Sequence, residues 1–299
     1  MPSPHISSAG KTETLNTPAI IGGLSDIQVP FTHILMDIFG VLHEGGSVFP
    51  GALDCLRHLK DQGKKVWLFS NSPRSAAAIS QNLATRDVAP DLYNGIFSSG
   101  QDVRNAMLNP DETYKRLGNR FYHIGDPQCD TLQNTPLQQV DLMNEASFIL
   151  LTGPKSSIQD MEGYEELLRH AQALALPVIC ANPDPYVILS GQRVLCAGTL
   201  ALMYQNIGGT VYWHGKPHQA FYQQALQHMG APAQDILAIG DSMWTDIAGA
   251  SQAGIKSLML TDMGVHRSDF LEKPLQPTLE TFLRDFSFAP TFVARQLAP

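Results

Sequence analysis

Four reactive side chains in this sequence each follow a short apolar run. They are Asp37, Ser70, Lys216 and Asp241, and the runs before them span 33–36, 65–69, 210–215 and 235–240. Such runs are typical of buried β-strands, and open α/β sheets place their reactive groups at the C-terminal ends of these strands. We therefore expect an acid, a hydroxyl, an ammonium and a second acid to meet at one edge of a sheet.

The pattern between and beyond these runs predicts an α/β fold built on a parallel sheet. Helical spacing over 52–62 and 75–85 alternates with strand patterns, which indicates βαβ units and a parallel sheet. After Gly100 the pattern restarts, with strands expected at 120–124, 146–152 and 176–180 and a helix at 161–174. The sheet then resumes with a helix at 199–206, the strand before Lys216, helices at 220–229 and 245–253 and a strand at 256–260.

This order of elements predicts an inserted domain. We expect a flexible segment over 1–23 and a Rossmann-like core, with helices on both faces of a parallel sheet, over 24–100 and 199–299. An α/β cap domain would occupy 101–198 between the two parts of the core.

Composition excludes several classes of protein. The 299 residues are 43% hydrophobic, which suffices for a substantial core. The net charge is −8 and there is no basic cluster, which disfavours nucleic acid or an anionic membrane as a partner. The four cysteines form no CxxC pair, as expected for reduced thiols. The first 17 residues are polar and no run approaches a membrane span, so we expect a cytoplasmic protein.

The four segments resemble the motifs of the haloacid dehalogenase (HAD) superfamily. The similarity is greatest to its type IIA branch, which consists mostly of phosphatases with a cap domain inserted in mid-chain. The matching segments are DIFGV at 37–41, SNS at 70–72, GKP at 215–217 and GDSMWTD at 240–246, and CANPD at 180–184 resembles a cap segment of that branch. The resemblance extends from about Ser25 to the end of the chain.

The resemblance implies a Mg²⁺-dependent phosphohydrolase that acts on a small phosphorylated metabolite, such as a sugar phosphate, through an aspartyl-phosphate. Asp37 would be the nucleophile, and Lys216 would keep it ionised and balance phosphate charge. Ser70 and the backbone amides of Asn71 and Ser72 would bind the phosphoryl oxygens together with Lys216. The implied metal ligands are Asp37, the backbone carbonyl of Phe39, Asp241 and Asp246. A homodimer formed through the cap is a further implication of the resemblance.

Phe39 departs from the family pattern, which has a second aspartate at this position. In the family that aspartate protonates the leaving oxygen, and loss of such help typically costs ~10²–10⁴-fold in rate. His43 and Glu44 follow closely, and His43 is the better candidate replacement because its ordinary pKa lies near neutrality. A loop histidine without a role explains His43 equally well.

Two further groups of residues have both functional and purely structural interpretations. Asn182, Asp184 and Tyr186 follow an expected cap strand and would set substrate specificity, although an Asn-Pro-Asp-Pro turn also accounts for them. Arg74 would bind an anion or would lie in solvent. His214 and His218 flank Lys216 as structural residues or substrate contacts, since Gly215 and Pro217 oppose a continuous helix with two histidine ligands.

Three functions therefore remain open. The first is the phosphohydrolase. The second is a metal-independent dehalogenase, or a phosphonate-cleaving enzyme that forms a Schiff base on a cap lysine, for which Lys115 and Lys155 are available. The third is a ligand-binding protein that has lost turnover, which Phe39 favours.

Overall fold

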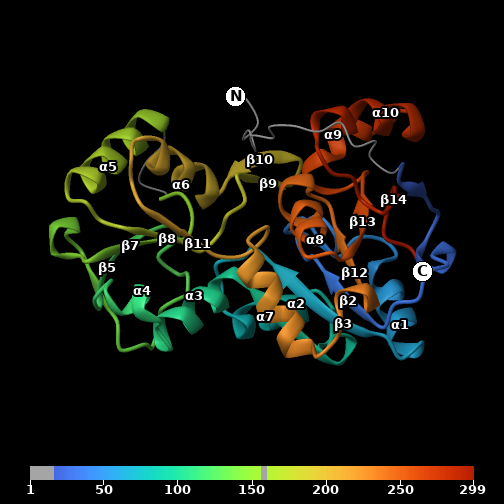
Figure 1. Cartoon of the computed structure of the whole chain (residues 1–299), viewed down its shortest axis with the longest axis horizontal. Coiled ribbons are helices and arrows are strands. Elements are labelled where there is room, and N and C mark those ends of the chain that lie inside the picture. The colour runs from blue at the N-terminus through green and yellow to red at the C-terminus, as the bar shows by residue number, and fades with distance from the viewer. Residues whose placement is uncertain (1–16, 156–159) are drawn as a thin grey trace.

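The computed structural model describes residues 17–155 and 160–299, and these form two parallel sheets in two lobes (Figure 1). In the first sheet the strands lie in the order β1-β14-β13-β12-β2-β3-β4. Their bounds are β1 Ala19–Ile20, β2 His33–Met36, β3 Lys65–Ser70, β4 Gly95–Ser98, β12 Ile236–Gly240, β13 Lys256–Leu260 and β14 Phe292–Ala294.

The apolar side chains of β2 alternate between the two faces of this sheet. Ile34 and Met36 pack with α1 (Ala52–Asp61) and α2 (Ala76–Ala84), whereas Leu35 packs with α7 (Gln219–Met229) and α8 (Ala248–Gln252). Burial on both faces is the reason that the strand is a continuous apolar run. The expected Rossmann-like core with helices on both faces is thereby confirmed.

The second sheet is also parallel and has helices on both faces. Its order is β11-β8-β7-β5-β6, with α5 and α6 packed on one face and α3 and α4 on the other. The strands are β5 Arg120–Ile124, β6 Gln138–Val140, β7 Phe148–Leu151, β8 Val178–Cys180 and β11 Val211–Trp213. The helices are α3 Ser99–Leu108, α4 Glu112–Lys115, α5 Met161–Ala173 and α6 Ala197–Asn206.

The strand before Lys216 does not belong to the first sheet, contrary to the sequence-based expectation. That strand is β11, which pairs with β8 in the second sheet, and α6 packs against the same sheet. The chain therefore leaves the first sheet after Ser98 and returns only after Trp213. We propose that the inserted domain extends to about residue 213 instead of ending at 198.

A short antiparallel hairpin that the sequence analysis did not predict follows β8. Its strands are β9 (Tyr186–Leu189) and β10 (Gln192–Leu195), joined by Ser190 and Gly191. In Figure 1 the hairpin lies between the two lobes, and β9 contacts the segment Gly264–His266 of the first lobe. The hairpin thus connects the inserted domain to the edge where β2 and β12 end.

The two ends of the described chain also differ from expectation. Residues 1–16 of the expected flexible segment lie outside the described residues, but Ala19–Ile20 form β1, which pairs with β14. The C-terminal part adds α9 (Arg267–Phe270) and α10 (Leu275–Phe282), neither of which was predicted. The expected helix at 245–253 begins with one wide π-helical turn at Met243–Ile247.

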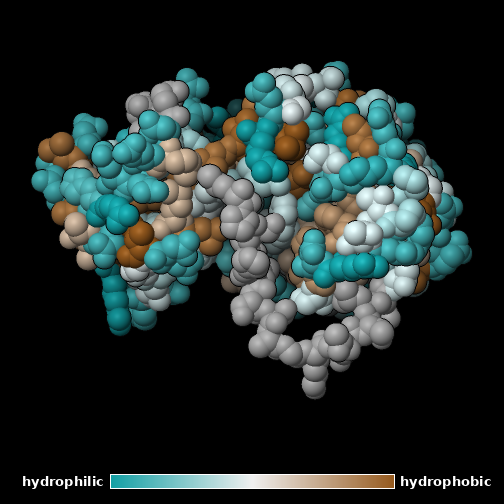
Figure 2. Space-filling view, turned by 90° about the horizontal axis from the view of Figure 1, so that it is seen from above, coloured by the Kyte–Doolittle hydropathy of each residue, from teal (hydrophilic) through white to brown (hydrophobic). Residues whose placement is uncertain are grey.

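The described part of the molecule is mostly hydrophilic on the face seen in Figure 2, where hydrophobic residues form small separate patches. Among residues 17–155 and 160–299, no helix combines the length and apolar character needed to cross a bilayer.

Candidate active site

The carboxylates Asp37 and Asp241 lie at the ends of neighbouring strands. Asp37 follows β2 and Asp241 follows β12, and these strands pair in parallel with Met36 opposite Ile239. From β2 the chain continues to β3 and β4 on one side, while β12, β13 and β14 lie on the other. The two acids therefore stand at the point where the strand order reverses, which is where open α/β sheets bind ligands.

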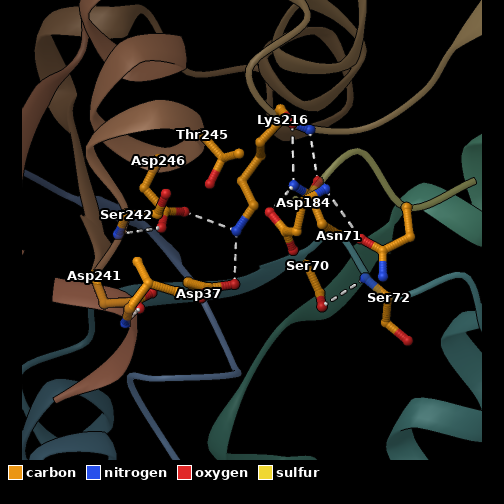
Figure 3. Close-up of polar contacts among 12 residues, drawn as sticks. Asp37, Ser70, Asn71, Ser72, Asp184, Lys216, Asp241, Ser242, Thr245 and Asp246 are labelled. Atoms are coloured by element: carbon orange, nitrogen blue, oxygen red, sulfur yellow. Dashed lines mark hydrogen bonds and ion pairs between the residues drawn. The ribbon is translucent and has the colours of Figure 1, made fainter. Parts of the chain in front are cut away.

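Lys216 reaches this point from the second lobe and contacts two carboxylates. Its Nζ donates to Asp37 Oδ1 at 2.6 Å and to Asp246 Oδ1 at 2.7 Å, as Figure 3 shows. Only 2% of the Lys216 side chain is exposed. Burial opposes its charged form, but Asp246 and Asp37 outweigh burial and raise the pKa of Lys216.

Asp37, Asp241 and Asp246 form a compact acidic cluster. One oxygen of each lies within 4.8 Å of the others, and all three residues are buried. Burial raises the pKa of Asp37 to about 7, against the opposing effect of Lys216. Burial and the charge of Asp37 raise the pKa of Asp241 well above its ordinary value. A single ammonium faces three carboxylates, so this donor set fits a small divalent cation with oxygen ligands.

Glycines allow other backbone segments to approach Asp241 closely. Gly40 (φ 92°) and Gly264 (φ 66°) both have left-handed backbone conformations. A Cβ added at Gly40 would lie 2.6 Å from the Asp241 carboxylate, and one at Gly264 would lie 1.8 Å from its Oδ2. The adjacent amide of Val265 donates to Asp241 Oδ2 at 2.7 Å and so fixes the carboxylate.

Asn71 links the two lobes at the active site. Its Oδ1 accepts from the Lys216 amide at 2.7 Å, and its Nδ2 donates to the Lys216 carbonyl at 3.0 Å and to Asp184 Oδ1 at 2.8 Å. The side chain of Asn71 thus positions the lysine turn. In the same loop the Ser72 amide donates to Ser70 Oγ at 3.1 Å.

A cavity of about 620 Å³ opens over this cluster. The predicted catalytic, phosphate-binding, metal-binding and specificity residues line it, although their roles stay predictions: Asp37, Phe39, His43, Ser70, Asn71, Ser72, Asn182, Asp184, Tyr186, Lys216, Asp241 and Asp246. The cavity is formed by residues from both lobes, which agrees with an active site that the inserted domain covers.

His43 is buried beside Phe39, with the two ring centroids 5.6 Å apart. His43 Nδ1 accepts from the Gly45 amide at 3.0 Å, so its ring proton is on Nε2. Burial, assisted by Arg86, lowers the pKa of His43 to about 4. Glu44 accepts from the Gly264 amide at 2.8 Å and is not among the residues that line the cavity.

The sequence analysis missed several residues of the cavity wall. Val187, Ile188 and Leu189 of β9 line the cavity together with Trp244, whose ring centroid lies 5.8 Å from that of the predicted Tyr186. Arg86 lines it as well, and its guanidinium donates to the Gly45 carbonyl at 2.8 Å. The turn signal Ser190-Gly191 between Tyr186–Leu189 and Gln192–Leu195 could have revealed the hairpin.

Three models of HAD-type families match the chain. Two described as haloacid dehalogenase-like hydrolase match residues 34–134 and 125–254, and a third HAD-like hydrolase model matches 213–298. Together they cover 34–298 without a gap. The chain belongs to the haloacid dehalogenase-like hydrolases.

Similarity to individual hydrolases of this kind extends over most of the chain. "Ribonucleotide monophosphatase NagD" of Escherichia coli K12 is 22% identical over 265 residues, which cover 82% of this chain and 94% of the relative. "Dihydroxyacetone phosphatase" of Corynebacterium glutamicum is 29% identical over 250 residues, covering 82% and 86%. A solved haloacid dehalogenase-like hydrolase from Brucella suis superposes with a TM-score of 0.79 at 27% identity, covering 93% of this chain and all of that one.

The remaining candidates of the sequence analysis lie around this HAD site or away from it. Arg74 lines the cavity and pairs with Asp126 at 3.0 Å, which joins the lobes. His214 is buried and its Nδ1 bonds to Asp102 at 2.7 Å, so it has a structural contact. Lys115 pairs with Glu112 on the surface and Lys155 donates to Tyr122, and neither lines the cavity.

Proposed function

We propose that this protein is a Mg²⁺-dependent phosphohydrolase that cleaves a small phosphorylated compound through an aspartyl-phosphate. The observation that carries the proposal is the position of Lys216 Nζ, which bonds to both Asp37 and Asp246 beside the third acid, Asp241. This arrangement combines an ionised nucleophile, a fixed positive charge and a donor set for a divalent cation.

In the first step an Asp37 oxygen attacks phosphorus, and the bond from phosphorus to the leaving oxygen breaks. Lys216 binds Oδ1, so Oδ2 is the oxygen without this contact. In the second step water attacks the phosphorus of the aspartyl-phosphate, the bond to Asp37 breaks, and phosphate and the free carboxylate are released. Lys216 stabilises the ionised Asp37 at the start and end of this cycle.

The residues that would hold Mg²⁺ are Asp37, Asp241 and Asp246, with the backbone carbonyl of Phe39 as the predicted fourth ligand. When bound, the cation supplies positive charge that offsets the repulsion between Asp37 and an anionic phosphate. Val265 holds Asp241, and Lys216 holds Asp37 and Asp246, so the chain itself preorganises these ligands.

Ser70, Asn71, Ser72 and Lys216 would bind the phosphoryl oxygens, and the inserted domain would select the rest of the substrate. The names of the relatives suggest nucleotides and small sugar phosphates as the first compounds to test. Asn182, Asp184 and Tyr186 line the cavity from the second lobe, as residues that determine specificity would. A cytoplasmic location and a homodimer stay predictions.

The acidic cluster favours phosphoryl transfer over the two other reactions on this scaffold. A metal-independent dehalogenase has no need of three clustered carboxylates, and a Schiff-base mechanism needs a lysine in the cavity. Lys115 and Lys155 lie outside it. Metal dependence of turnover separates these mechanisms directly.

The test is phosphate release from a panel of phosphorylated metabolites and aryl phosphates, with Mg²⁺ and with EDTA. Asp37→Asn should abolish a Mg²⁺-dependent release while the fold persists. Asp54→Asn is the matched control, because Asp54 carries the same group on the surface with 74% of its side chain exposed. Full activity of Asp37→Asn would contradict the nucleophile, and activity in EDTA would contradict the metal.

A further inference from the structure

The inference concerns proton transfer in the proposed phosphohydrolysis, and it therefore rests on the proposed function. An alkyl phosphate expels an alkoxide, which needs a proton as it departs, and water needs a base when it attacks the aspartyl-phosphate. A positioned acid–base group typically contributes ~10²–10⁴-fold in rate. Phe39 stands where the family pattern has the aspartate for this task, and a phenyl ring cannot exchange protons.

Among the described residues that line the cavity, Asp184 is the one carboxyl outside the acidic cluster. It reaches the cavity from the second lobe, and its Oδ1 accepts from Asn71 Nδ2 at 2.8 Å. Figure 3 shows it beside Asn71 and the Lys216 turn. Its charge also acts on Asp37, whose pKa it raises further. Asp184 therefore shares the site with the nucleophile and with the predicted phosphate-binding loop.

The backbone around Asp184 is held in place by its own domain. The Asp184 amide donates to Asn182 Oδ1 at 3.1 Å, and its carbonyl accepts from the Gly198 amide at 3.1 Å. A Cβ added at Gly198 would lie 2.5 Å from the Asp184 carbonyl oxygen, so glycine permits this contact. Thr199 Oγ1 donates to the carbonyl of Pro185 at 2.8 Å. The start of α6 thus fixes the direction from which the carboxyl enters the cavity.

The environment of Asp184 suits a group that both donates and accepts a proton. Burial raises the pKa of Asp184 to about 6, and the charge of Asp246 adds to the rise. Lys216, Asn71 and Thr245 act in the opposite direction. Acid–base catalysis is most efficient when the pKa of the group lies near the working pH. Both forms of this carboxyl are accordingly populated near neutrality.

His43 is less suited to this task than Asp184, although it lies beside Phe39. Its Nδ1 accepts from the Gly45 amide, so its single ring proton is on Nε2. Burial, assisted by Arg86, lowers its pKa to about 4. The ring is therefore neutral near pH 7, and a neutral imidazole is a very weak acid.

The remaining ionisable groups that the structure describes in the wall are also poor proton donors. Lys216 donates to two carboxylates, which raise its pKa. Arg74 and Arg86 carry guanidinium groups, which do not release protons in proteins. Burial raises the pKa values of the Tyr186 hydroxyl and the Cys196 thiol.

We propose that Asp184 is the general acid and base of this site, supplied by the inserted domain in place of an aspartate at position 39. When Asp37 attacks, the bond from phosphorus to the leaving oxygen breaks, and that oxygen takes the proton of the Asp184 carboxyl. In the second step the Asp184 carboxylate takes a proton from the attacking water, the bond from phosphorus to Asp37 breaks, and phosphate leaves. The cycle consumes one water molecule and returns Asp184 to its protonated form.

The first measurement needs no variant. The wild-type protein is assayed with Mg²⁺ on 4-nitrophenyl phosphate and on benzyl phosphate, an alkyl ester of similar size. Nitrophenolate leaves without a proton, whereas the benzyl alkoxide requires one. With a general acid in place, we expect the two kcat/KM values to lie within ~10²-fold of each other. A larger gap would show that no acid acts and would overturn the inference.

The second measurement assigns the acid to Asp184. Asp184→Asn keeps the shape of the side chain and an acceptor for Asn71 but removes the acid. It should lower kcat/KM by ~10²–10⁴-fold for benzyl phosphate and by less than ~10-fold for 4-nitrophenyl phosphate, because only the former needs the proton. Asp141→Asn is the matched control, since Asp141 is an exposed residue of the same domain, and it should leave both values unchanged.

The third measurement concerns the second step, which is common to all substrates. Without its base, Asp184→Asn should hydrolyse the aspartyl-phosphate slowly. Nitrophenol should therefore appear in a stoichiometric burst, followed by a steady rate slower than that of the wild type. A side chain that only contacts the substrate would give no burst, so its absence would contradict the role of Asp184 as a base.

The outcomes separate this inference from the proposed function. Equal losses on the two phosphates in Asp184→Asn, or a selective loss in His43→Gln instead, would overturn the inference and leave the phosphohydrolase intact. Urea unfolding checks the fold of each variant, and Asp184→Ser, which keeps a polar group beside Asn71, takes the place of Asp184→Asn if that variant does not fold. No phosphate release by the wild type would overturn the proposed function, and this inference with it.

Discussion

Replacing Asp37 with Asn should alter the pH dependence of stability in the metal-free protein. Burial raises the pKa of Asp37 to about 7 in the folded state, whereas its ordinary value is 3.8. The folded protein therefore holds this proton more tightly than the unfolded chain does. Stability from this group is highest below about pH 4 and falls as the pH rises through about 7, because the buried carboxylate must then ionise.

The size of the effect follows from the two pKa values. A difference of about three units, at about 1.36 kcal/mol per unit, corresponds to ~4 kcal/mol of unfolding free energy. Lys216, 2.6 Å from Asp37, is already included as an opposing influence. Histidines with lowered pKa values, such as His43 and His123, act in the opposite direction: the stability of the folded protein that depends on their neutral form is lost as the pH falls. These histidines are present in both proteins, so their contribution cancels in the difference, which reports Asp37 together with its effect on Asp241.

The assay is urea unfolding in EDTA at a series of pH values from 4 to 8 for the wild type and Asp37→Asn. Relative to the wild type, Asp37→Asn should gain up to ~4 kcal/mol in unfolding free energy across this range. Mg²⁺ should reduce the gain, since a bound cation favours the ionised aspartate. If the difference in unfolding free energy between Asp37→Asn and the wild type stayed constant within ~1 kcal/mol, or shrank as the pH rises, the reasoning would be refuted. Ionisation of the buried Asp37 would then not destabilise the folded protein.

Two further predictions concern the residues that hold the acidic cluster. Lys216→Met should lower the unfolding free energy by ~3–5 kcal/mol at neutral pH and abolish turnover, because it leaves buried carboxylates without their counter-charge. If urea unfolding showed a loss below ~1 kcal/mol, that result would contradict a stabilising buried ion pair. Gly264→Ala should weaken Mg²⁺ binding by calorimetry, since its Cβ would collide with Asp241 Oδ2, whereas Gly191→Ala, also at positive φ but in open space, should not. Equal Mg²⁺ affinity in the two variants would show that Asp241 has room to move.

The sequence was sufficient for features that depend on local pattern. The strands at Arg120–Ile124 and Lys256–Leu260 have the predicted bounds, because glycine or polar residues mark the ends of each run in the sequence. Asp37 and Asp241 were placed together because parallel strands bring their C-terminal ends to one edge. These inferences need no knowledge of which strands pair at long range.

Features that depend on tertiary contacts were missed or misplaced. The run before Lys216 has the pattern of any buried parallel strand, so nothing local shows that β11 pairs with β8 and not with β2 or β12. The β9 residues are half-buried or exposed without a strict alternation, since they line a cavity instead of packing on one core. The lowered pKa of His43 likewise arises from burial and Arg86, neither of which can be read from its sequence neighbours.

Lys216 lies just after β11, the last strand of the second sheet, in the segment that returns to the first lobe. Asn71 fixes the lysine turn through two hydrogen bonds to Lys216 and donates a third to Asp184, and Arg74 binds Asp126 in the same interface. The turn that carries Lys216 is thus held by Asn71 of the first lobe. The cavity wall, in contrast, is completed by β9, which contacts Gly264–His266, Trp244 and Gly45 of the first lobe. Substitutions in the hairpin can therefore reshape the cavity for a different leaving group while the Lys216–Asp37 contact is preserved.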